Sequence, residues 1–259
     1  MKMRIQYASD LHLEFDENTA YLKAKPLEVA GDILVLAGDT IYFGDKIHDA
    51  DWFFDWCSAN YRQTYLIPGN HEYYGGFPIE KTIRGFEYKI RDNVTYLNNK
   101  SVVIGDTELF FTTLWTHIPS NESYIIEKLM TDCRLALCDG KRFNAQSWNR
   151  LHKACTEWLV NALEKSDAKN KVVISHHCPY RNEAGVRFVG KMAENGYVSD
   201  MWPLLGKYGI RYWIHGHIHL LTGSTQDGTI VRSNPLGYVD DGENRYFIKN
   251  AVMEITSEK

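Results

Sequence analysis

The stretch Ile33-Leu34-Val35-Leu36-Ala37-Gly38-Asp39 is a continuous apolar run that ends in a glycine and a carboxylate. A run of this length without alternation is typical of a strand that is covered on both faces of a sheet. Four similar runs occur elsewhere, each ending in small or polar residues: Arg4–Ala8, Thr64–Ile67, Val172–Ser175 and Tyr212–Ile214. We therefore predict a sheet core of buried, largely parallel strands.

Helix-period segments lie between these runs. The clearest has one apolar stripe and predicts a helix that ends near Lys165; its residues are Trp148, Leu151, Cys155, Trp158, Leu159 and Ala162. Alternating strands and helices predict an α/β fold. Other segments favour antiparallel strands: Val102–Ile104 and Leu109–Leu114 around a Gly105-Asp106 turn, and Thr229–Ser233 with Tyr246–Ile255.

Two long segments, Thr116–Ala145 and Pro179–Tyr197, are polar, contain glycine and have weak periodicity. Loops of this length in a compact domain are usually functional, so we interpret them as lids or binding loops. No repeat, low-complexity segment or linker divides the chain. We expect a single domain over residues 1–259, with loop insertions near 116–145 and 179–197.

Composition restricts the possible partners. The 259 residues are 44% hydrophobic, enough for one substantial core, and the net charge is -4. No run of Lys and Arg is present, so no duplex nucleic-acid partner is expected. No apolar run approaches the ~20 residues of a membrane span, and the start does not resemble a signal peptide. Five cysteines without a CxxC pair indicate reduced thiols, and we predict a cytoplasmic protein with no membrane partner.

Histidine, aspartate and asparagine side chains follow the predicted strands directly. The five groups are Asp10-Leu11-His12, Gly38-Asp39, Gly69-Asn70-His71-Glu72, Ser175-His176-His177 and His215-Gly216-His217-Ile218-His219. The carboxyl ends of parallel strands meet at one crevice of an open α/β sheet, so these groups should converge. Each group alone is commonly a turn, a cap or a core histidine. All five at strand ends predict a site.

The expected donors are two Asp carboxylates, one Asn amide oxygen and several imidazoles. Such nitrogen and oxygen ligands without a thiolate suit manganese, iron, zinc or a similar ion. They are too many for one metal position and enough for two that share a carboxylate. Two ions ~3.5–4 Å apart can clamp the attacking and leaving oxygens of a displacement.

In this order, the five groups resemble the signature of calcineurin-like metallophosphoesterases, over nearly the whole chain from Asp10 to His219. The resemblance implies the metallo-dependent phosphatase fold, a four-layer αββα sandwich of two mixed β-sheets flanked by helices. It also implies hydrolysis of a phosphate ester by a hydroxide held between two divalent metal ions. Manganese is the favoured metal, with iron, zinc and nickel as alternatives.

The resemblance assigns a role to each matching residue. Asp10, His12 and His219 would bind one metal; Asn70, His176 and His217 would bind the second; Asp39 would bridge both. His71 would be the catalytic histidine that is not a ligand, acting on the transition state or the leaving oxygen.

The sequence assigns less definite roles to the residues next to these predicted ligands. Glu72 either orients His71 or is a solvated or capping carboxylate. His177 and His215 match no ligand position, so we expect them to contact ligands or substrate. Cys178 is interpreted as a small buried residue.

The chain departs from the Ser/Thr protein phosphatases of the superfamily. They carry two phosphate-gripping arginines, where this sequence has Thr40-Ile41-Tyr42-Phe43 and Ile67-Pro68-Gly69. The Pro-Gly-Asn-His form is more similar to the bacterial phosphodiesterase branch. Thr131-Asp132-Cys133-Arg134 resembles a branch of uncharacterised bacterial metallophosphoesterases. Arg134 is either a substitute phosphate contact or a salt-bridge partner of Asp132.

The leading hypothesis is a hydrolase for a phosphodiester or phosphomonoester of small-molecule size. A nucleotide phosphodiesterase or nuclease is the alternative, and a protein phosphatase or a non-catalytic metal-binding scaffold is less favoured. The aromatic cluster Trp52, Phe53, Phe54 and Trp56 is interpreted as a helix packing its apolar face rather than a base-stacking platform. A metallo-β-lactamase type is disfavoured because its clustered His-x-His-x-Asp-His run is absent.

Overall fold

The computed structural model describes residues 2–181, 190, 192–204 and 206–256, which form two six-stranded sheets. The first has the order β14-β1-β2-β3-β5-β4. Its four central strands are parallel, and both edge strands are antiparallel to their neighbours. The strands are β1 (Lys2–Ala8), β2 (Ile33–Leu36), β3 (Gln63–Leu66), β4 (Phe86–Arg91), β5 (Val94–Asn98) and β14 (Val252–Thr256).

The second sheet has the order β12-β13-β11-β10-β7-β6 and repeats this pattern of a parallel centre with antiparallel edges. Its strands are β6 (Lys100–Ile104), β7 (Thr107–Thr112), β10 (Asn170–Ser175), β11 (Ile210–His215), β12 (Gly223–Gln226) and β13 (Thr229–Ser233). The predicted hairpin around Gly105-Asp106 is the β6–β7 pair. All five predicted strand runs lie in central strands of the two sheets.

Strand β2 shows why its sequence is apolar throughout. Successive side chains point to opposite faces of a strand. Ile33 and Val35 enter the core between the two sheets, whereas Leu34 and Leu36 enter the core beneath the helices of the first sheet. All four are fully buried. The strand is covered on both faces, as its sequence predicts.

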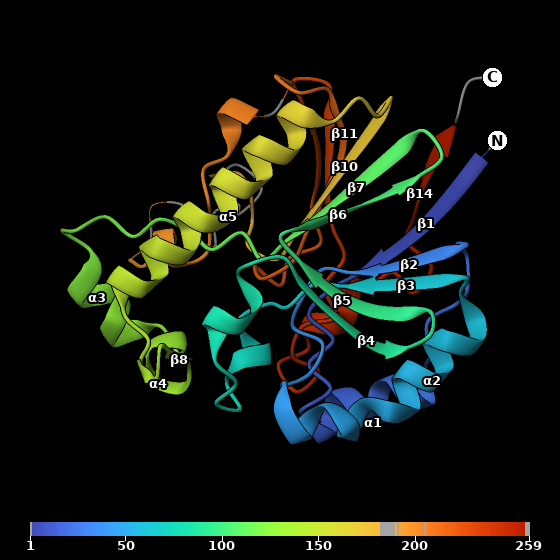
Figure 1. Ribbon diagram of the computed structural model, residues 1–259. Coiled ribbons are helices and arrows are strands. Elements are labelled where there is room, and N and C mark those ends of the chain that lie inside the picture. Colours follow the sequence, from blue (N-terminus) through green and yellow to red (C-terminus); the bar gives the residue numbers. More distant parts are fainter. Residues whose placement is uncertain (1, 182–189, 191, 205, 257–259) are drawn as a thin grey trace.

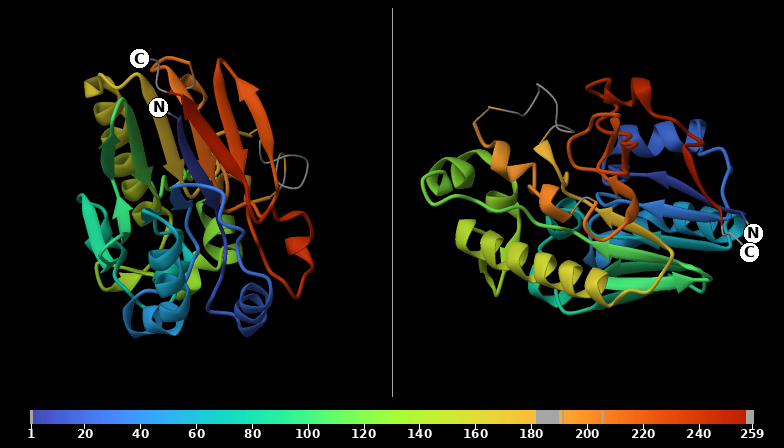
Figure 2. Two further views of the ribbon diagram at one scale, coloured as in Figure 1. Left: turned by 90° about the vertical axis from the view of Figure 1, so that its right-hand side faces the viewer. Right: turned by 90° about the horizontal axis from the view of Figure 1, so that it is seen from above.

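Helices complete the four layers. Helices α1 (Asp16–Ala24) and α2 (Asp51–Asn60) lie on the outer side of the first sheet, and α5 (Ala145–Lys165) lies on the outer side of the second (Figures 1 and 2). The α5 helix buries four of the six residues of the predicted stripe, whereas Trp158 and Ala162 are partly exposed. Its N-cap Asn144 accepts a hydrogen bond from Ser147 N. In α2, Phe53 and Phe54 are buried, which supports the helix-packing interpretation. The predicted αββα sandwich of two mixed sheets is confirmed.

Two sequence-based expectations need correction. Residues 116–145 contain short elements instead of a structureless loop: α3 (Ser123–Leu129), α4 (Asp132–Leu135), β8 (Leu137–Cys138) and β9 (Lys141–Arg142). Elements of one or two turns are too short to show a helical period. The α3 helix packs against both α4 and α5 (Figure 1).

The second correction concerns the C-terminal strands. Thr229–Ser233 and Tyr246–Ile255 each supply a strand to an antiparallel pair, as expected, but they do not pair with each other. Strand β13 pairs with β12 in the second sheet, and β14 pairs with β1 in the first. An alternating pattern identifies a strand but not its partner. Much of the other expected loop, 179–197, lies outside the described residues. All five cysteines are buried and unbridged. Among the described residues, no helix is long and apolar enough to cross a membrane.

Candidate metal centre

The carboxyl ends of strands from both sheets meet at one place. The turns after β1, β2 and β3 supply residues from the first sheet, and the turns after β10 and β11 supply residues from the second. All seven sequence-predicted ligands lie there, with side chains buried or nearly so: Asp10, His12, Asp39, Asn70, His176, His217 and His219. They form two groups with Asp39 between them.

The first group consists of Asp10, His12 and His219, whose ligand atoms lie within 4.8 Å of one another. His12 Nε2 is 3.0 Å from His219 Nε2, and Asp10 Oδ1 is 3.4 Å from that same nitrogen. The other ring nitrogen of each histidine contacts a carboxylate: His12 Nδ1 is 3.1 Å from Glu14, and His219 Nδ1 is 2.6 Å from Glu243.

The second group contains Asp39, His176 and His217, with Asn70 beside them. His176 Nε2 is 2.8 Å from Asn70 Oδ1 and 3.2 Å from His217 Nδ1. The outward nitrogens again contact acceptors: His176 Nδ1 is 2.9 Å from the Ala37 carbonyl, and His217 Nε2 is 3.3 Å from the Gly196 carbonyl.

Asp39 lies between the groups. Its Oδ2 is 3.4 Å from His176 Nε2 and 3.9 Å from His12 Nε2. Its Oδ1 accepts a hydrogen bond from His71 N at 2.9 Å. One carboxylate oxygen therefore faces both groups while the other is held by the backbone.

The four histidine side chains of the two groups are arranged as metal ligands usually are. In each of four histidines one ring nitrogen contacts an acceptor, and the other faces a second potential ligand. An acceptor on the outer nitrogen fixes the tautomer and leaves the inner lone pair for a cation, the usual support of a metal-bound histidine. Two nitrogen lone pairs facing each other, as in His12 and His219, repel unless a cation or a proton lies between them. The donor chemistry therefore suits a metal at each group.

The pKa values of the histidines in this cluster are shifted in opposite directions. Burial lowers the pKa of His219, but hydrogen bonds with Asp10 and Glu243 outweigh it and raise the pKa to about 10. Burial likewise lowers the pKa of His176, and the Asp39 carboxylate raises it to about 9. Burial and the neighbouring His177 and His176 hold the pKa of His217 well below its usual value. Positive charge is thus favoured beside the carboxylates.

The backbone is strained at these positions. Five of the seven predicted ligands have φ between +47° and +69°: Asp10, His12, Asp39, His217 and His219. Left-handed φ costs a residue with a side chain roughly 1–2 kcal/mol, and such strain concentrates at functional sites. The turns after the strands aim these side chains at one centre.

Two glycines provide the space for this geometry. A Cβ on Gly69 would overlap Asp39 Oδ1, and a Cβ on Gly216 would lie 2.6 Å from Asp10 Oδ2. Any side chain at either position would displace a predicted ligand. The glycines of the Gly-Asn-His and Gly-His motifs are therefore explained by close approach to the two carboxylates.

His71 lies at the same centre without belonging to either group. Its Nδ1 is 2.7 Å from Glu14 Oε1 and its Nε2 is 3.3 Å from the Tyr238 hydroxyl. Burial lowers the pKa of His71, but the Asp39 and Glu14 carboxylates outweigh it and the net pKa is raised. The imidazole is therefore held with Nε2 available toward the pocket and its proton favoured.

Glu72 does neither of the two things expected from the sequence. It is fully buried, and it accepts hydrogen bonds from the backbone nitrogens of Asp39, Thr40 and Gly69 and from the Tyr96 hydroxyl. The carboxylate thus joins the turns after β2 and β3. Glu14, not Glu72, orients the His71 side chain.

The remaining motif residues are not among the predicted ligands, although His177 lies against one of them, as expected. His177 is buried beside the His217 ring, 4.3 Å between centroids, and contacts the Thr113 carbonyl. His215 contacts Thr222 at the edge of the second sheet. Arg134 is exposed and donates to Thr131 Oγ1; among the described residues it forms no ion pair with Asp132 and does not line the pocket.

Sequence reasoning missed Glu14 and Glu243. Glu14 follows His12 by two residues in the run Asp10-x-His12-x-Glu14, and this spacing is a signal that could have identified it. Glu243 begins the 3-10 helix η6 (Glu243–Tyr246), 24 residues after His219, and no local pattern connects the two.

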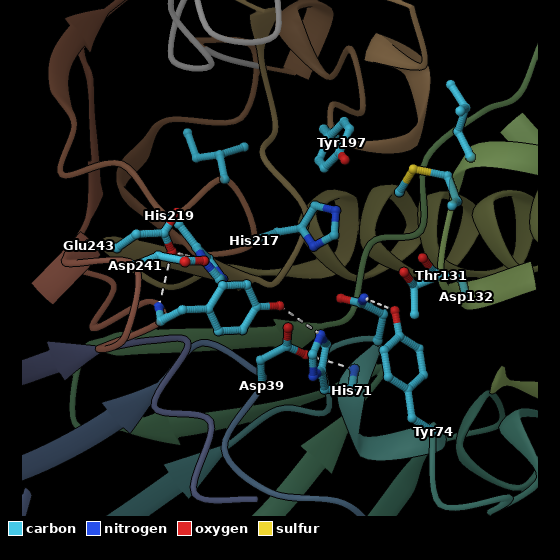
Figure 3. Close-up of a pocket in the computed structure, with 15 residues that line it drawn as sticks. Asp39, His71, Tyr74, Thr131, Asp132, Tyr197, His217, His219, Asp241 and Glu243 are labelled. Carbon is cyan, nitrogen blue, oxygen red and sulfur yellow. Dashed lines mark hydrogen bonds and ion pairs between the residues drawn. The ribbon is translucent and has the colours of Figure 1, made fainter. Parts of the chain in front are cut away.

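A pocket of about 240 Å³ opens above the two groups (Figure 3). Its described lining includes Asp39, Asp132, Asp241 and Glu243 but neither Lys nor Arg. Aromatic and apolar side chains complete the walls: Tyr74, Tyr197, Tyr238, Leu129, Met130 and Ile218. The described part of the pocket offers a phosphate no cationic side chain other than protonated histidine, so attraction for an anion would come from bound metal.

Known proteins are similar to this chain in sequence and in fold. An uncharacterized protein of Acanthamoeba polyphaga mimivirus is 26% identical over 93% of this chain and 94% of its own. The fold is similar to phosphopantetheinyl hydrolase from Mycobacterium tuberculosis, with a TM-score of 0.70, 15% identity, and 98% and 96% of the two chains covered. It is also similar to GAP50, the anchor in the inner membrane complex of Plasmodium, with a TM-score of 0.50, 12% identity, and 91% and 71% covered.

The decisive match is to the family model for calcineurin-like phosphoesterases, which covers residues 3–221. That range includes every predicted ligand and the central strands of both sheets except β13. The chain belongs to the calcineurin-like phosphoesterases, metal-dependent hydrolases of phosphate esters.

Proposed function

We propose that the chain, acting as a single domain, hydrolyses a small phosphate ester with two divalent metal ions. Asp10, His12 and His219 would hold one ion, and Asn70, His176 and His217 the other. Asp39 would bridge both. The observation that carries this proposal is the position of Asp39 Oδ2, 3.4 Å from His176 Nε2 and 3.9 Å from His12 Nε2, between two groups of inward-facing ring nitrogens.

When bound, such ions would act as Lewis acids on the phosphoryl oxygens and lower the pKa of water from 15.7 to near 7. The nitrogen and oxygen donors suit manganese, with iron, zinc or nickel as alternatives. Each histidine of the two groups would coordinate through its inward nitrogen, because its outward nitrogen is already committed to Glu14, Glu243 or a backbone carbonyl.

The part assigned to His71 is proton donation to the leaving oxygen. Glu14 holds Nδ1, so the proton at Nε2 is directed at the pocket, where Tyr238 lies 3.3 Å away. The net raised pKa of His71 favours the protonated form that a general acid needs.

The charge of the pocket supports a diester substrate. Among the described lining residues there are four carboxylates and no Lys or Arg. A phosphomonoester dianion is repelled more strongly here than a phosphodiester monoanion, and it gains no arginine contact in return. Small size is consistent with a pocket of about 240 Å³.

A nucleotide phosphodiesterase is the second candidate. Tyr74, Tyr197 and Tyr238 line the pocket, and an aromatic ring offers a nucleobase a stacking surface. A protein phosphatase is less favoured because neither phosphate-gripping arginine is present. We also propose that the protein is cytoplasmic, because its five cysteines are unbridged and free thiols are typical of a reducing compartment.

The test uses metal-free protein reloaded separately with manganese, zinc, iron or nickel. Each preparation is assayed on chromogenic phosphomonoesters and phosphodiesters, including nucleotide esters. Turnover that returns only with metal and is lost in Asp39→Ala supports the proposal. Equal hydrolysis by metal-free and reloaded protein would contradict it.

A further inference from the structure

We propose that Tyr74 and Asp132 form a relay that fixes the Asn70 side-chain amide with its oxygen toward the second metal position. Tyr74 and Asp132 are therefore positioning residues, because neither is one of the predicted metal ligands. This inference rests on the proposed function, because it takes Asn70 as a ligand there.

The amide of Asn70 has two ends of similar shape and opposite chemistry. Its Oδ1 is 2.8 Å from His176 Nε2, in the second group, and its Nδ2 donates to the Tyr74 hydroxyl at 2.7 Å. Only the oxygen has lone pairs that can bind a cation. A half-turn of the amide would instead present two N–H groups to the metal. The affinity of this position therefore depends on which way the amide points.

Tyr74 alone does not decide the orientation. A phenolic hydroxyl both donates and accepts, so it can bond equally well to an amide NH₂ or to an amide oxygen. The choice depends on where the hydroxyl proton goes.

Asp132 decides it. The residue begins α4, is 1% exposed and lines the pocket together with Tyr74, so its carboxyl group is an acceptor available to the Tyr74 hydroxyl proton. Burial raises the pKa of Asp132 to about 6, so the group is an ionised acceptor at neutral pH. A carboxylate only accepts, so the Tyr74 proton is directed to Asp132. The hydroxyl lone pairs then remain for Asn70 Nδ2, and Oδ1 faces the metal position.

The relay connects the metal centre to a distant part of the chain. Asp132 lies in the segment of short elements between residues 116 and 145, whereas Tyr74 and Asn70 lie in the turn after β3. Figure 3 shows Tyr74 and Asp132 side by side on one wall of the pocket. The position of α4 is thereby coupled to the affinity of one of the two metal positions. Asp132 Oδ1 is buried with no hydrogen-bond partner among the described residues, so the carboxylate is not committed to another donor through that oxygen.

The experiment is a manganese titration of metal-free protein, by calorimetry, for wild type, Tyr74→Phe, Asp132→Leu and the double variant. We expect each single variant to weaken one of the two binding events by about 10–100-fold, the usual effect of losing a residue that supports a metal ligand, and to leave the other unchanged. The double variant should be no weaker than either single one, because both interrupt the same relay. Asp132→Asn, whose amide oxygen still accepts, should bind nearly as wild type.

Tyr42→Phe is the matched control. Tyr42 packs near Tyr74, 6.2 Å between ring centroids, and makes no hydrogen bond to a predicted ligand among the described residues. Thermal unfolding of each metal-free variant separates misfolding from loss of affinity. Wild-type affinity in Tyr74→Phe, additive losses in the double variant, or an equal loss in Asp132→Asn would overturn the relay. If Asn70→Ala itself keeps both binding events at wild-type affinity, the ligand assignment of the proposed function fails instead.

Discussion

Oε1 of Glu14 lies 2.7 Å from His71 Nδ1 and 3.1 Å from His12 Nδ1. A single buried carboxylate oxygen therefore supports both the candidate proton donor and a candidate metal ligand. Burial raises the pKa of Glu14, but hydrogen bonds with His12 and His71 outweigh it and lower the pKa, so the group stays ionised. In the proposed function, proton donation and metal binding would therefore share one support.

The first prediction compares Glu14→Gln with Glu243→Gln, because each glutamate holds the Nδ1 of a ligand histidine. Both variants should lose about 10–100-fold in metal affinity at the first group. Only Glu14→Gln should also make turnover more sensitive to the pKa of the leaving group, since only Glu14 supports His71. Metal affinity is measured by manganese titration, and the leaving-group dependence is measured as turnover on a series of aryl esters with different leaving-group pKa values. Equal leaving-group dependence in the two variants would remove Glu14 from the proton-donor role.

The second prediction separates His71 from the ligands. His71→Ala should keep both metals and lose about 10²–10⁴ in turnover on an ester with a poor leaving group. The loss of turnover should be smaller on an ester whose leaving group is p-nitrophenolate, because this leaving group needs little proton assistance. His217→Ala should lose metal and activity together. Metal content and turnover are measured on the same preparations. Parallel loss of metal in His71→Ala would show that His71 is a ligand.

The third prediction concerns the glycines that make room for the carboxylates. Gly69→Ala places a methyl group against Asp39 Oδ1, so metal binding should fall while the fold survives. Overpacking of this kind costs about 1–3 kcal/mol of stability. Gly44→Ala is the control: its φ of +79° makes a side chain costly by about 1–2 kcal/mol, but no atom lies within 4 Å. Thermal unfolding should show comparable losses, and metal analysis should show a deficit in Gly69→Ala alone.

The fourth prediction concerns substrate charge. Activity on a bis-aryl phosphodiester should match or exceed activity on the aryl phosphomonoester, because the described pocket lining lacks an arginine that would favour a dianion. The measurement is kcat/KM for the two esters with the same leaving group. A monoester preference of tenfold or more, ~1.4 kcal/mol in transition-state binding, would contradict the diester assignment.

Much of this fold is readable from the sequence, because most central strands of the two sheets are largely apolar on both faces. The run from Ile33 to Asp39 contains the pattern of a buried strand and the polar group delivered at its end. The β4–β5 hairpin was not identified, since β4 is largely exposed and carries little apolar pattern. The pairing of β14 with β1 was not predictable either, because more than 240 residues separate the two strands.

The site shows the same division. Residues aimed by strand ends, such as Asp39 and His217, could be predicted because the motif and the strand are adjacent in sequence. Among the supporting residues, Glu14 lies two positions after His12 and could have been identified, but the others could not, because they reach the site from elsewhere in the fold. Glu243 approaches His219 from η6, and Asp132 approaches Tyr74 from α4. Only the folded chain shows which carboxylate faces which ring nitrogen.

The most direct test of the central claim is a crystal structure of the manganese-loaded protein, with anomalous scattering used to locate and count the ions. The proposed function predicts two ions per chain, about 3.5–4 Å apart, both bound by Asp39, with Asn70 and His176 on one and His12 and His219 on the other. A single ion bound only by His217 and His219 would contradict it.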